Sequence, residues 1–385
     1  MICEKSKCTG CSACLNICPK NAISMIEDDY GNIYPNIDSI KCINCGLCKK
    51  VCPQLNNKTQ FKSSKKAYAM YCIDQEKRSK SSSGGAATLF YEFILDKKGV
   101  VYGASNLFGK ENFGFVKITD KKDLYKVKGS KYVHCYTNNI YKDVKTELEN
   151  KKKVLFIGTP CQVDGLKCYL MKEYENLFCI DIICHGVPSQ KLLFDELDNL
   201  NIKKESVNYI IFRDDKRFTF KVIDNENNIL IDKPSNQICY YNNFLEGNIY
   251  RDNCYNCKYA KRERISDITI GDFWGLNHNS IVYDDEKKGI SLILQNTEKG
   301  LFLIESIKNK SVIEERPLEE SYKENGQLNH PMSKNKKYEI YKKYYPQLGY
   351  KETCKKMISF KDKVKKIIKS RSIIYKIYKK NNNKI

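Results

Sequence analysis

Short apolar runs alternate with longer amphipathic segments through the middle of the chain. Three runs predict buried strands, over Ala67–Cys72, Lys153–Ile157 and Leu177–Ile183. Each precedes a segment with helical periodicity, and these segments cover Ala86–Leu95, the residues from Cys161 to Met171, and Ser189–Leu200. Strands that alternate with helices are typical of α/β domains, so we predict a mixed α/β fold for this part of the chain.

Changes of composition divide the 385 residues into segments. A cysteine-rich segment ends near residue 56, and the polar stretch Asn56–Lys66 has the composition of a linker. A chain of this length exceeds one ordinary core. We predict a first domain over residues 1–56, a larger domain built from residues 66–150 and 151–330, and a basic tail over residues 331–385.

Cysteine usage points to metal. The chain holds 19 cysteines and one tryptophan, an odd cysteine count in a chain far longer than a disulfide-stapled secreted scaffold. No run approaches 18 consecutive apolar residues, and the first residues show no apolar signal region. We therefore expect a cytoplasmic protein that neither spans a membrane nor is exported.

The first domain repeats one cysteine motif. The spacing C-x2-C-x2-C-x3-C-P occurs twice, 34 residues apart, at Cys8, Cys11, Cys14 and Cys18 and again at Cys42, Cys45, Cys48 and Cys52. Three thiolates on one tight loop bind three irons of a cubane, and the fourth cysteine reaches the other cluster. We assign one [4Fe-4S] cluster to Cys8, Cys11, Cys14 and Cys52 and the second to Cys42, Cys45, Cys48 and Cys18.

Zinc is the alternative metal for this segment. Its usual sites use two Cys or His pairs separated by roughly 12 to 20 residues, so four cysteines within eleven residues suit it badly. Cys3 lies outside the repeat, and we interpret it as a bystander. Residues 1–56 resemble bacterial two-cluster ferredoxins.

A hydroxyl- and glycine-rich segment precedes the helix predicted at Ala86. It comprises Ser81, Ser82, Ser83, Gly84 and Gly85, and Arg78 and Lys80 lie just before it. Amide donors at a helix start beside positive charge suit a phosphate group. An ordinary helix N-cap is the alternative.

Four more cysteines have a position or spacing typical of ligands. Cys161 and Cys184 follow the ends of two predicted strands, where open α/β sheets bind ligands, and Cys254 and Cys257 form a close pair. Three interpretations stay open for them: a third cluster, a zinc site at the close pair, and buried free thiols.

Several segments together resemble the coenzyme F420 hydrogenase/dehydrogenase beta-subunit family over roughly residues 66–320. The matching segments, in order, are Lys128–Tyr132, Phe156–Gln162, Asp181–Pro188, Cys254–Tyr259 and Ser266–Gly275. The resemblance implies FAD and a further four-iron cluster, so Cys161, Cys184, Cys254 and Cys257 become the ligands expected for a third cluster. The predicted fold is then a small ferredoxin-like domain followed by a larger mixed α/β domain that binds flavin and a cluster.

The same resemblance implies roles for other residues. It places Ser81–Gly85 and the residues Lys128, Ser130, Lys131 and Tyr132 at the FAD pyrophosphate and ring edge. It places Thr159, Gln162, His185 and Gly186 near the flavin or the cluster. Two questions stay open: whether Cys135 is packing or an alternative ligand, and whether Arg264, Asp267, Asp272 and Trp274 touch cofactor or support the cluster loop.

We predict an iron–sulfur flavoprotein oxidoreductase. Flavins exchange hydrides while clusters carry single electrons, so electrons would pass between a ferredoxin-type one-electron partner and an organic substrate, in either direction. The alternative is a non-catalytic electron-transfer subunit of a larger redox complex. No zinc finger or RNA-reading motif accompanies the basic charge, so we do not expect nucleic-acid binding.

The basic charge is concentrated in the tail. The chain carries a formal net charge of +21, of which residues 331–385 contribute +15. Residues 361–385 have an apolar stripe at helical spacing surrounded by lysines, which suits an acidic protein partner or membrane surface. A solvated or self-packing terminal helix is the alternative.

Overall fold

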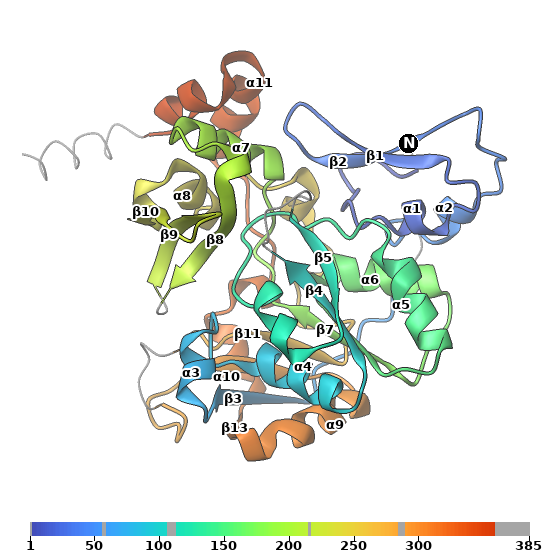
Figure 1. Cartoon of the computed structure of the whole chain (residues 1–385), viewed down its shortest axis with the longest axis vertical. Helices are drawn as coiled ribbons and strands as arrows, with labels where there is room; N and C mark the ends of the chain where they lie inside the picture. The colour runs from blue at the N-terminus through green and yellow to red at the C-terminus, as the bar shows by residue number, and fades with distance from the viewer. Residues whose placement is uncertain (1, 56–58, 106–112, 215–216, 284–288, 359–385) are drawn as a thin grey trace, which may run out of the picture. The chain divides into compact units, whose positions relative to one another are not determined.

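The computed structural model describes residues 2–55, 59–105, 113–214, 217–283 and 289–358 (Figure 1). Residues 1–333 form one compact unit and residues 334–385 a second. The described part of the second unit is the helix α11 (Lys336–Met357), which is kinked at Gly349. The amphipathic segment predicted over residues 361–385 lies outside the described residues. In the described part of the chain, no helix has the length and apolar character needed to cross a membrane.

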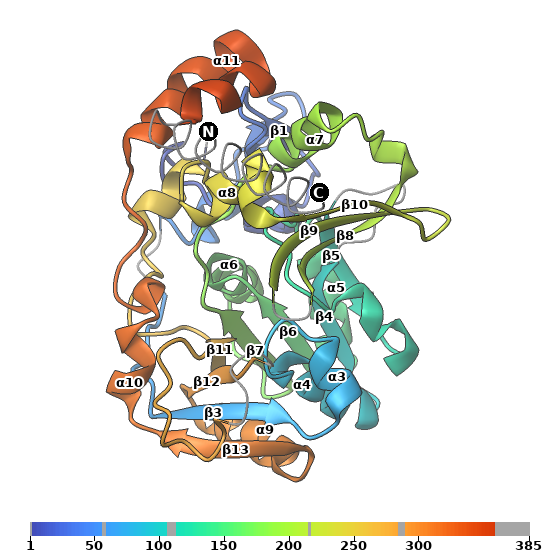
Figure 2. The same ribbon diagram turned by 90° about the vertical axis from the view of Figure 1, so that its left-hand side faces the viewer.

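An eight-stranded mixed sheet forms the centre of the first unit (Figure 2). Its strands, in spatial order, are β13 (Ser311–Arg316), β3 (Lys66–Cys72), β12 (Ser291–Gln295), β11 (Ile268–Asp272), β7 (Leu177–Ile182), β6 (Val154–Gly158), β4 (Val100–Ser105) and β5 (Gly114–Ile118). The neighbours β11, β7, β6 and β4 run parallel, and antiparallel strands extend the sheet on both sides. The predicted mixed α/β fold and the three predicted strands are confirmed.

Helices cover both faces of the sheet. In β6, Leu155 and Ile157 face a core shared with α4 (Ala86–Asp96) and α9 (Glu298–Ile307). Val154 and Phe156 face the opposite core, shared with α5 (Ile140–Glu149) and α6 (Pro160–Leu170). Because successive side chains of a strand point to opposite faces, a strand covered on both sides reads as a continuous apolar run.

A smaller aromatic layer stands beside the main sheet. It contains the antiparallel strands β8 (Val207–Asp214), β9 (Arg217–Asp224) and β10 (Ile229–Pro234) and the helix α8 (Cys239–Leu245). The Tyr132 ring packs against Phe244, with ring centroids 4.6 Å apart. The remaining helices of the larger domain are α3 (Gln75–Ser79), α7 (Gln190–Asn199) and α10 (Leu318–Lys323).

The cysteine-rich N-terminal segment packs against the helices α5 and α6 of the larger domain. It contains the hairpin of β1 (Ile23–Glu27) and β2 (Ile33–Ile37) and the short helices α1 (Ala13–Ile17) and α2 (Leu47–Lys50). Helix α1 lies against α5 and α6 (Figure 1). Polar bonds fix this contact: the Asn16 amide donates to the Asn138 carbonyl at 2.6 Å, and the Thr137 hydroxyl donates to the Cys11 carbonyl at 2.9 Å.

Residues 59–65, in the stretch with the composition of a linker, are bonded to the larger domain. The backbones of Lys62 and Arg264 exchange two hydrogen bonds, of 2.7 and 2.8 Å. The Thr59 hydroxyl donates to Asp164 at 2.7 Å. The polar side chains predicted a linker, yet the backbone N–H and C=O groups of this segment bond to the larger domain. Such bonds do not depend on the polarity of the side chains.

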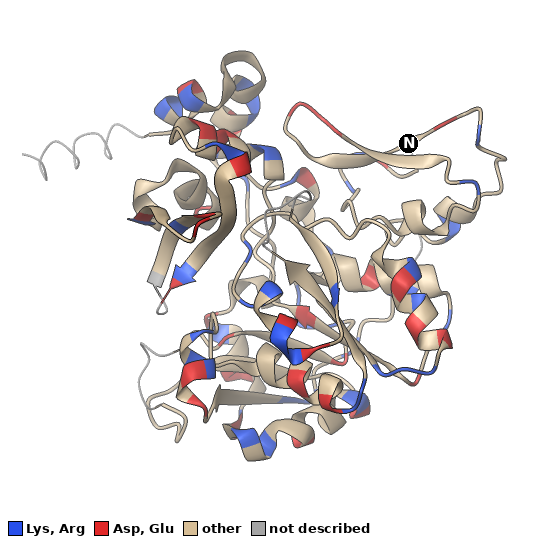
Figure 3. Ribbon diagram, in the orientation of Figure 1, with Lys and Arg blue, Asp and Glu red and all other residues tan. Residues whose placement is uncertain are grey.

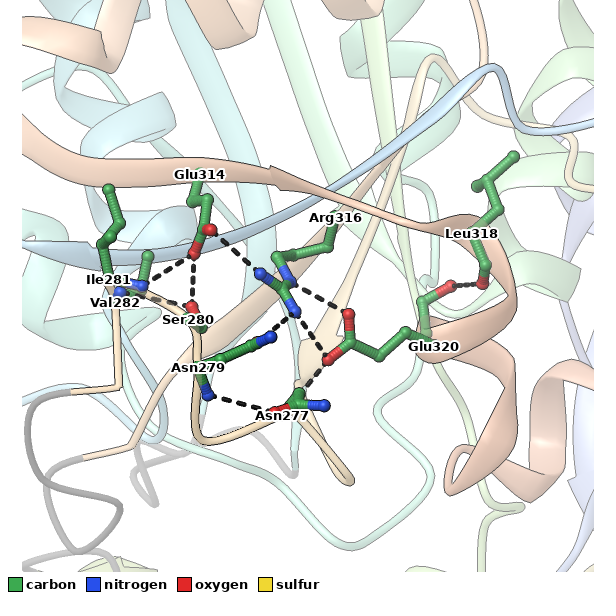
Figure 4. A network of polar contacts seen from close by, with 10 residues as sticks. Asn277, Asn279, Ser280, Ile281, Val282, Glu314, Arg316, Leu318 and Glu320 are labelled. Atoms are coloured by element: carbon green, nitrogen blue, oxygen red, sulfur yellow. Dashed lines mark hydrogen bonds and ion pairs between the residues drawn. The ribbon is translucent and has the colours of Figure 1, made fainter.

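The loop that follows β11 is held by an arginine between two carboxylates (Figure 4). Arg316 donates to Glu314 and to Glu320, each at 2.9 Å, and to the Asn279 side chain at 3.1 Å. Glu314 also accepts from the backbone of Ile281, at 3.1 Å. These bonds fix residues 277–282 against β13, and Trp274 lies near the start of the same loop.

Candidate functional site

A large cavity of about 430 Å³ lies at the carboxyl ends of β6, β7 and β11. Its walls come from the loops that follow these strands, from the start of α4 and from the aromatic layer. The sequence named thirteen residues for cofactor contact, and twelve of them line this one cavity. Residues from four distant parts of the chain therefore meet at the strand ends, where open α/β sheets bind ligands.

Gly84 is the exception because it faces the sheet. A Cβ atom on Gly84 would lie 2.2 Å from the Met70 carbonyl oxygen and 2.7 Å from the Ser291 nitrogen. Real Cβ atoms do not approach backbone so closely, so only glycine lets this loop lie against β3 and β12. Gly84 therefore shapes the loop instead of contacting a ligand.

The start of α4 offers unused donors to the large cavity. Its N-cap residue is Gly85, and no side chain caps the helix, so the serines are not an ordinary N-cap. Within the part of the chain that the structure describes, the Ser82 hydroxyl is buried without a hydrogen-bond partner, whereas the hydroxyls of Ser81 and Ser83 donate to the backbone of Lys77 and Ile290. Free first-turn amides and a buried unpartnered hydroxyl favour an anionic ligand here.

Two lysines supply positive charge to the same cavity. Burial lowers the pKa of Lys128, and it lowers the pKa of Lys131 to about 8. The Lys131 ammonium donates to the backbone carbonyls of Lys128 and Gly129, at 2.7 and 3.0 Å. Since desolvation disfavours a charged ammonium, an anion in this cavity would restore its full charge.

Other lining residues hold the walls in place. Thr159 and Gln162 form a capping box at the start of α6, and the Gln162 amide donates to the Cys135 carbonyl at 2.8 Å. Arg213 pairs with Asp272 across the aromatic side of the cavity, with an N–O distance of 2.5 Å. Trp274, the single tryptophan of the chain, also lines the cavity and is 41% exposed.

A second, smaller cavity of about 30 Å³ is surrounded by four thiols, and we call it the four-thiol site. The thiols belong to Cys161, Cys184, Cys254 and Cys257, the set that the sequence proposed. Cys135 lines the large cavity instead, where its thiol is bonded to the Val133 carbonyl. Among the described residues, no three His, Cys, Asp or Glu side chains gather as the ligands of one metal ion do.

The donor set of the four-thiol site fits an iron cluster. Burial raises the pKa of Cys161 and of Cys184 to about 12, and it raises the pKa of Cys254 and Cys257 as well. Thiols held neutral by burial become thiolates only when a metal takes the place of the proton. Arg264 supports this site through a fully buried ion pair with Asp181, at 2.9 Å. Asp267 instead accepts the backbone amide of Cys179 inside the sheet.

The large cavity and the four-thiol site share a wall. Thr159, Cys184, His185 and Gly186 line both cavities. His134 also lines both, and burial lowers its pKa to about 3, so its ring is neutral. The sequence did not single out His134, although it lies between the Lys128–Tyr132 motif and Cys135, because only the fold places it between the two cavities.

The structure brings together the first of the two ligand sets that the repeat predicts. Cys8, Cys11, Cys14 and Cys52 line one small cavity, the first cysteine site. The charges of Cys42 and Cys45 act on Cys48, and Cys18 and Cys48 pack in a cluster of side chains that also contains Cys8, Cys14 and Cys52. The set of Cys18, Cys42, Cys45 and Cys48, which we call the second cysteine site, stays a prediction. Cys45 is exposed. Cys3, interpreted above as a bystander, lines the first site and hydrogen-bonds with Cys8 and Cys52.

The first cysteine site lies directly against the four-thiol site. A Cβ atom on Gly165 of α6 would lie 3.0 Å from the Cys11 sulfur. Gly165 is one helical turn beyond Cys161, on the same face of α6. Thr9, which belongs to the first cysteine loop, lines the four-thiol cavity.

Comparison with known proteins identifies both parts of the chain. Residues 151–321 match the family described as the C terminus of the coenzyme F420 hydrogenase/dehydrogenase beta subunit, and residues 7–56 match the 4Fe-4S dicluster domain. Residues 151–321 of the larger domain thus have the C-terminal part of an F420 hydrogenase/dehydrogenase beta subunit as their matching family. The resemblance predicted from the motifs is thereby confirmed, and the chain is an iron–sulfur protein of an oxidoreductase family.

A solved structure is also similar to this beta-subunit-like chain. It is the F420-reducing [NiFe] hydrogenase complex from Methanosarcina barkeri. The match covers 69% of this chain and 90% of that chain, at 17% sequence identity and a TM-score of 0.45.

Ligand assignment at the four-thiol site of this beta-subunit domain can be tested by serine substitution. Full loading of three cubanes requires about 12 iron atoms per chain, so Cys161→Ser should lower the iron content of anaerobically reconstituted protein to about eight. Cys135→Ser is the matched control and should keep the full content, because its thiol faces the other cavity. Equal iron loss in both variants would contradict this assignment.

Proposed function

We propose that the chain is a cytoplasmic iron–sulfur flavoprotein oxidoreductase. It would carry electrons between a one-electron protein partner and a hydride-exchanging organic substrate, through three [4Fe-4S] clusters and FAD. The observation that carries the proposal is the order of the sites: the exposed second cysteine site, the first cysteine site, the four-thiol site and the large cavity. Consecutive sites in the last three share residues or touch.

The large cavity fits a flavin dinucleotide in the chemistry of its lining. The start of α4, the buried Ser82 hydroxyl and the ammonium groups of Lys128 and Lys131 suit a pyrophosphate. Tyr132, Phe244 and Trp274 provide apolar ring faces in the same cavity. When bound, a flavin supplies hydride exchange on one side and single-electron exchange on the other.

The protein's own residues position the cysteines and separate the two cavities. Thr159 and Gln162 fix the start of α6 and hence the position of Cys161. His134 and His185 separate the two cavities, and burial lowers the pKa of both rings, which keeps them neutral at physiological pH. A neutral imidazole can bond to a cofactor without adding charge to the wall.

The second cysteine site is the exposed site at which a protein partner would dock. Ile40 is 95% exposed and Ile43 58% exposed, on either side of Cys42. Lys41, Lys49 and Lys50 of the same segment are also exposed, and Figure 3 shows basic residues on helix α2. An apolar centre with a basic rim fits a small acidic one-electron carrier, such as a ferredoxin.

Flavin binding tests the proposed function most directly. Titration of anaerobic protein with FAD should quench the emission of the single tryptophan, Trp274. Ser82→Glu should weaken binding at least tenfold, because a carboxylate at the helix start repels phosphate. Ser79→Glu adds the same charge to an exposed residue of the preceding helix, and it should bind FAD normally.

The result also separates the two candidate classes. Wild-type protein that takes up neither FAD nor FMN would contradict a flavoprotein. Protein that binds flavin and accepts electrons but passes them to no small molecule would be an electron-transfer subunit.

Flavin affinity should depend on pH through Lys131. Its lowered pKa of about 8 means that the ammonium is charged below pH 8 in the free protein and loses its charge as pH rises. The dissociation constant for FAD should therefore increase roughly tenfold between pH 7 and 9, the loss of about one charge-assisted hydrogen bond. Lys131→Met should bind more weakly at pH 7 and show a flat profile. An unchanged profile in that variant would remove Lys131 from the phosphate site.

Charge reversal tests the partner surface. The double variant Lys49→Glu/Lys50→Glu should slow reduction by an acidic ferredoxin at low salt, and the loss should shrink as ionic strength rises. Lys97→Glu/Lys98→Glu makes the same change at exposed lysines after α4 and should react as the wild type does. Cluster content should be the same in all three proteins. Equal rates at low salt would show that the partner docks elsewhere.

A further inference from the structure

Arg251 is the side chain that joins the N-terminal segment to the four-thiol site. It precedes Cys254 in the chain and is 1% exposed. Its guanidinium donates to the Cys8 carbonyl and to the Ile33 carbonyl, each at 2.8 Å, and stacks 4.2 Å from the Tyr34 ring. A residue of the larger domain is therefore inserted between the first cysteine loop and the β1–β2 hairpin.

The positive charge of Arg251 has no carboxylate beside it in the described structure. Two other buried arginines near the sites do have one: Arg264 pairs with Asp181, and Arg213 pairs with Asp272. Among the described residues, the Arg251 Nη1 atom is also buried without a hydrogen-bond partner. Burial of an uncompensated cation is unfavourable, so a negative group should lie where Nη1 points.

The position of the guanidinium indicates which negative groups these are. Arg251 lines the four-thiol cavity, and Nη1 lies 3.4 Å from where a Cβ atom on Gly10, in the first cysteine loop, would be. Arg251 lines the same cavity as Cys161 and is bonded to the backbone of Cys8, so it contacts one ligand-bearing segment of each site. A four-iron cluster with four thiolates carries about two negative charges when oxidised and one more when reduced.

We propose that Arg251 is a positioning residue for electron transfer, whose permanent charge raises the reduction potentials of the clusters in the first cysteine site and the four-thiol site. The inference rests on the proposed function. A buried cation beside these two sites would stabilise the more negative, reduced form of a cluster held there, without any proton uptake. The described contacts of Arg251 do not include the second cysteine site, whose lysines are exposed and screened by solvent, so the potentials of the two inner sites would be raised relative to that site. Arginine suits the task because it stays protonated at every physiological pH.

The test is a redox titration of the full-length protein, with each centre followed by electron paramagnetic resonance. Arg251→Gln should lower the reduction potential of each inner centre by about 59 mV or more. This shift corresponds to a tenfold change in the equilibrium constant of a one-electron reduction. The outer centre should not move. Arg251→Lys should restore most of the shift, because it keeps the charge and loses the paired hydrogen bonds. Cys161→Ser identifies which signal belongs to the four-thiol site.

Two controls separate charge from packing. Tyr34→Leu removes the stacking partner but no charge. It should change the reduction potentials by only a small fraction of the change that Arg251→Gln causes. Arg316→Gln removes a partly buried arginine far along the chain from every cysteine motif, and it should leave all centres unchanged.

Each outcome decides the proposal. Unchanged inner potentials in a fully loaded Arg251→Gln protein would overturn it, as would an equal shift of all three centres. If Arg251→Gln fails to assemble clusters while Arg251→Lys assembles them, the charge is needed and the proposal stands. If both fail alike, the role is structural and the proposal falls. Absence of a third centre from the wild type would instead count against the proposed function, and the first site would still report on Arg251.

Discussion

The contact between Cys11 and α6 is the constraint on which the arrangement of sites depends. Gly165 leaves room for the Cys11 sulfur, and Cys161 lies one turn away on the same helix face. Any larger side chain at Gly165 would push the N-terminal segment off the larger domain. This packing brings the first cysteine site against the four-thiol site, although their nearest cysteines, Cys52 and Cys161, lie 109 positions apart in the sequence. Close approach of this kind is what electron transfer between two cofactors would require.

Buried polar groups hold this junction in register. Thr137 bonds to the Cys11 backbone, Arg251 bonds to the Cys8 backbone, and Arg264 bonds to Asp181 behind the four-thiol site. Directional bonds of this kind are costly to leave unmade in a low-dielectric interior. They therefore specify one position of the N-terminal segment on the larger domain. Apolar contact alone is not directional and would allow other positions.

The sequence predicted much of the chemistry because local spacing carries it. The cysteine repeat predicted two sites with an exchanged fourth ligand, and the structure places Cys52 with Cys8, Cys11 and Cys14. The apolar runs predicted the strands that bring Cys161 and Cys184 to one edge of the sheet. The resemblance added residues of the large cavity. It also named Gly84, which faces the sheet instead, because a motif does not show which way a loop residue faces.

From the sequence alone, spacing predicted the two N-terminal ligand sets, the apolar pattern determined the mixed α/β class, and the resemblance of its motifs indicated the family and the ligands of the four-thiol site. Only the tertiary structure decided that Cys135 faces the large cavity, that Cys3 joins the first site, and that His134 and Arg251 lie between sites. The physical reason is the range of the interactions. Cluster loops and strands are encoded by neighbours within about twenty residues, whereas a buried cation or a shared wall depends on groups hundreds of residues apart that meet only when the sheet and its helices pack.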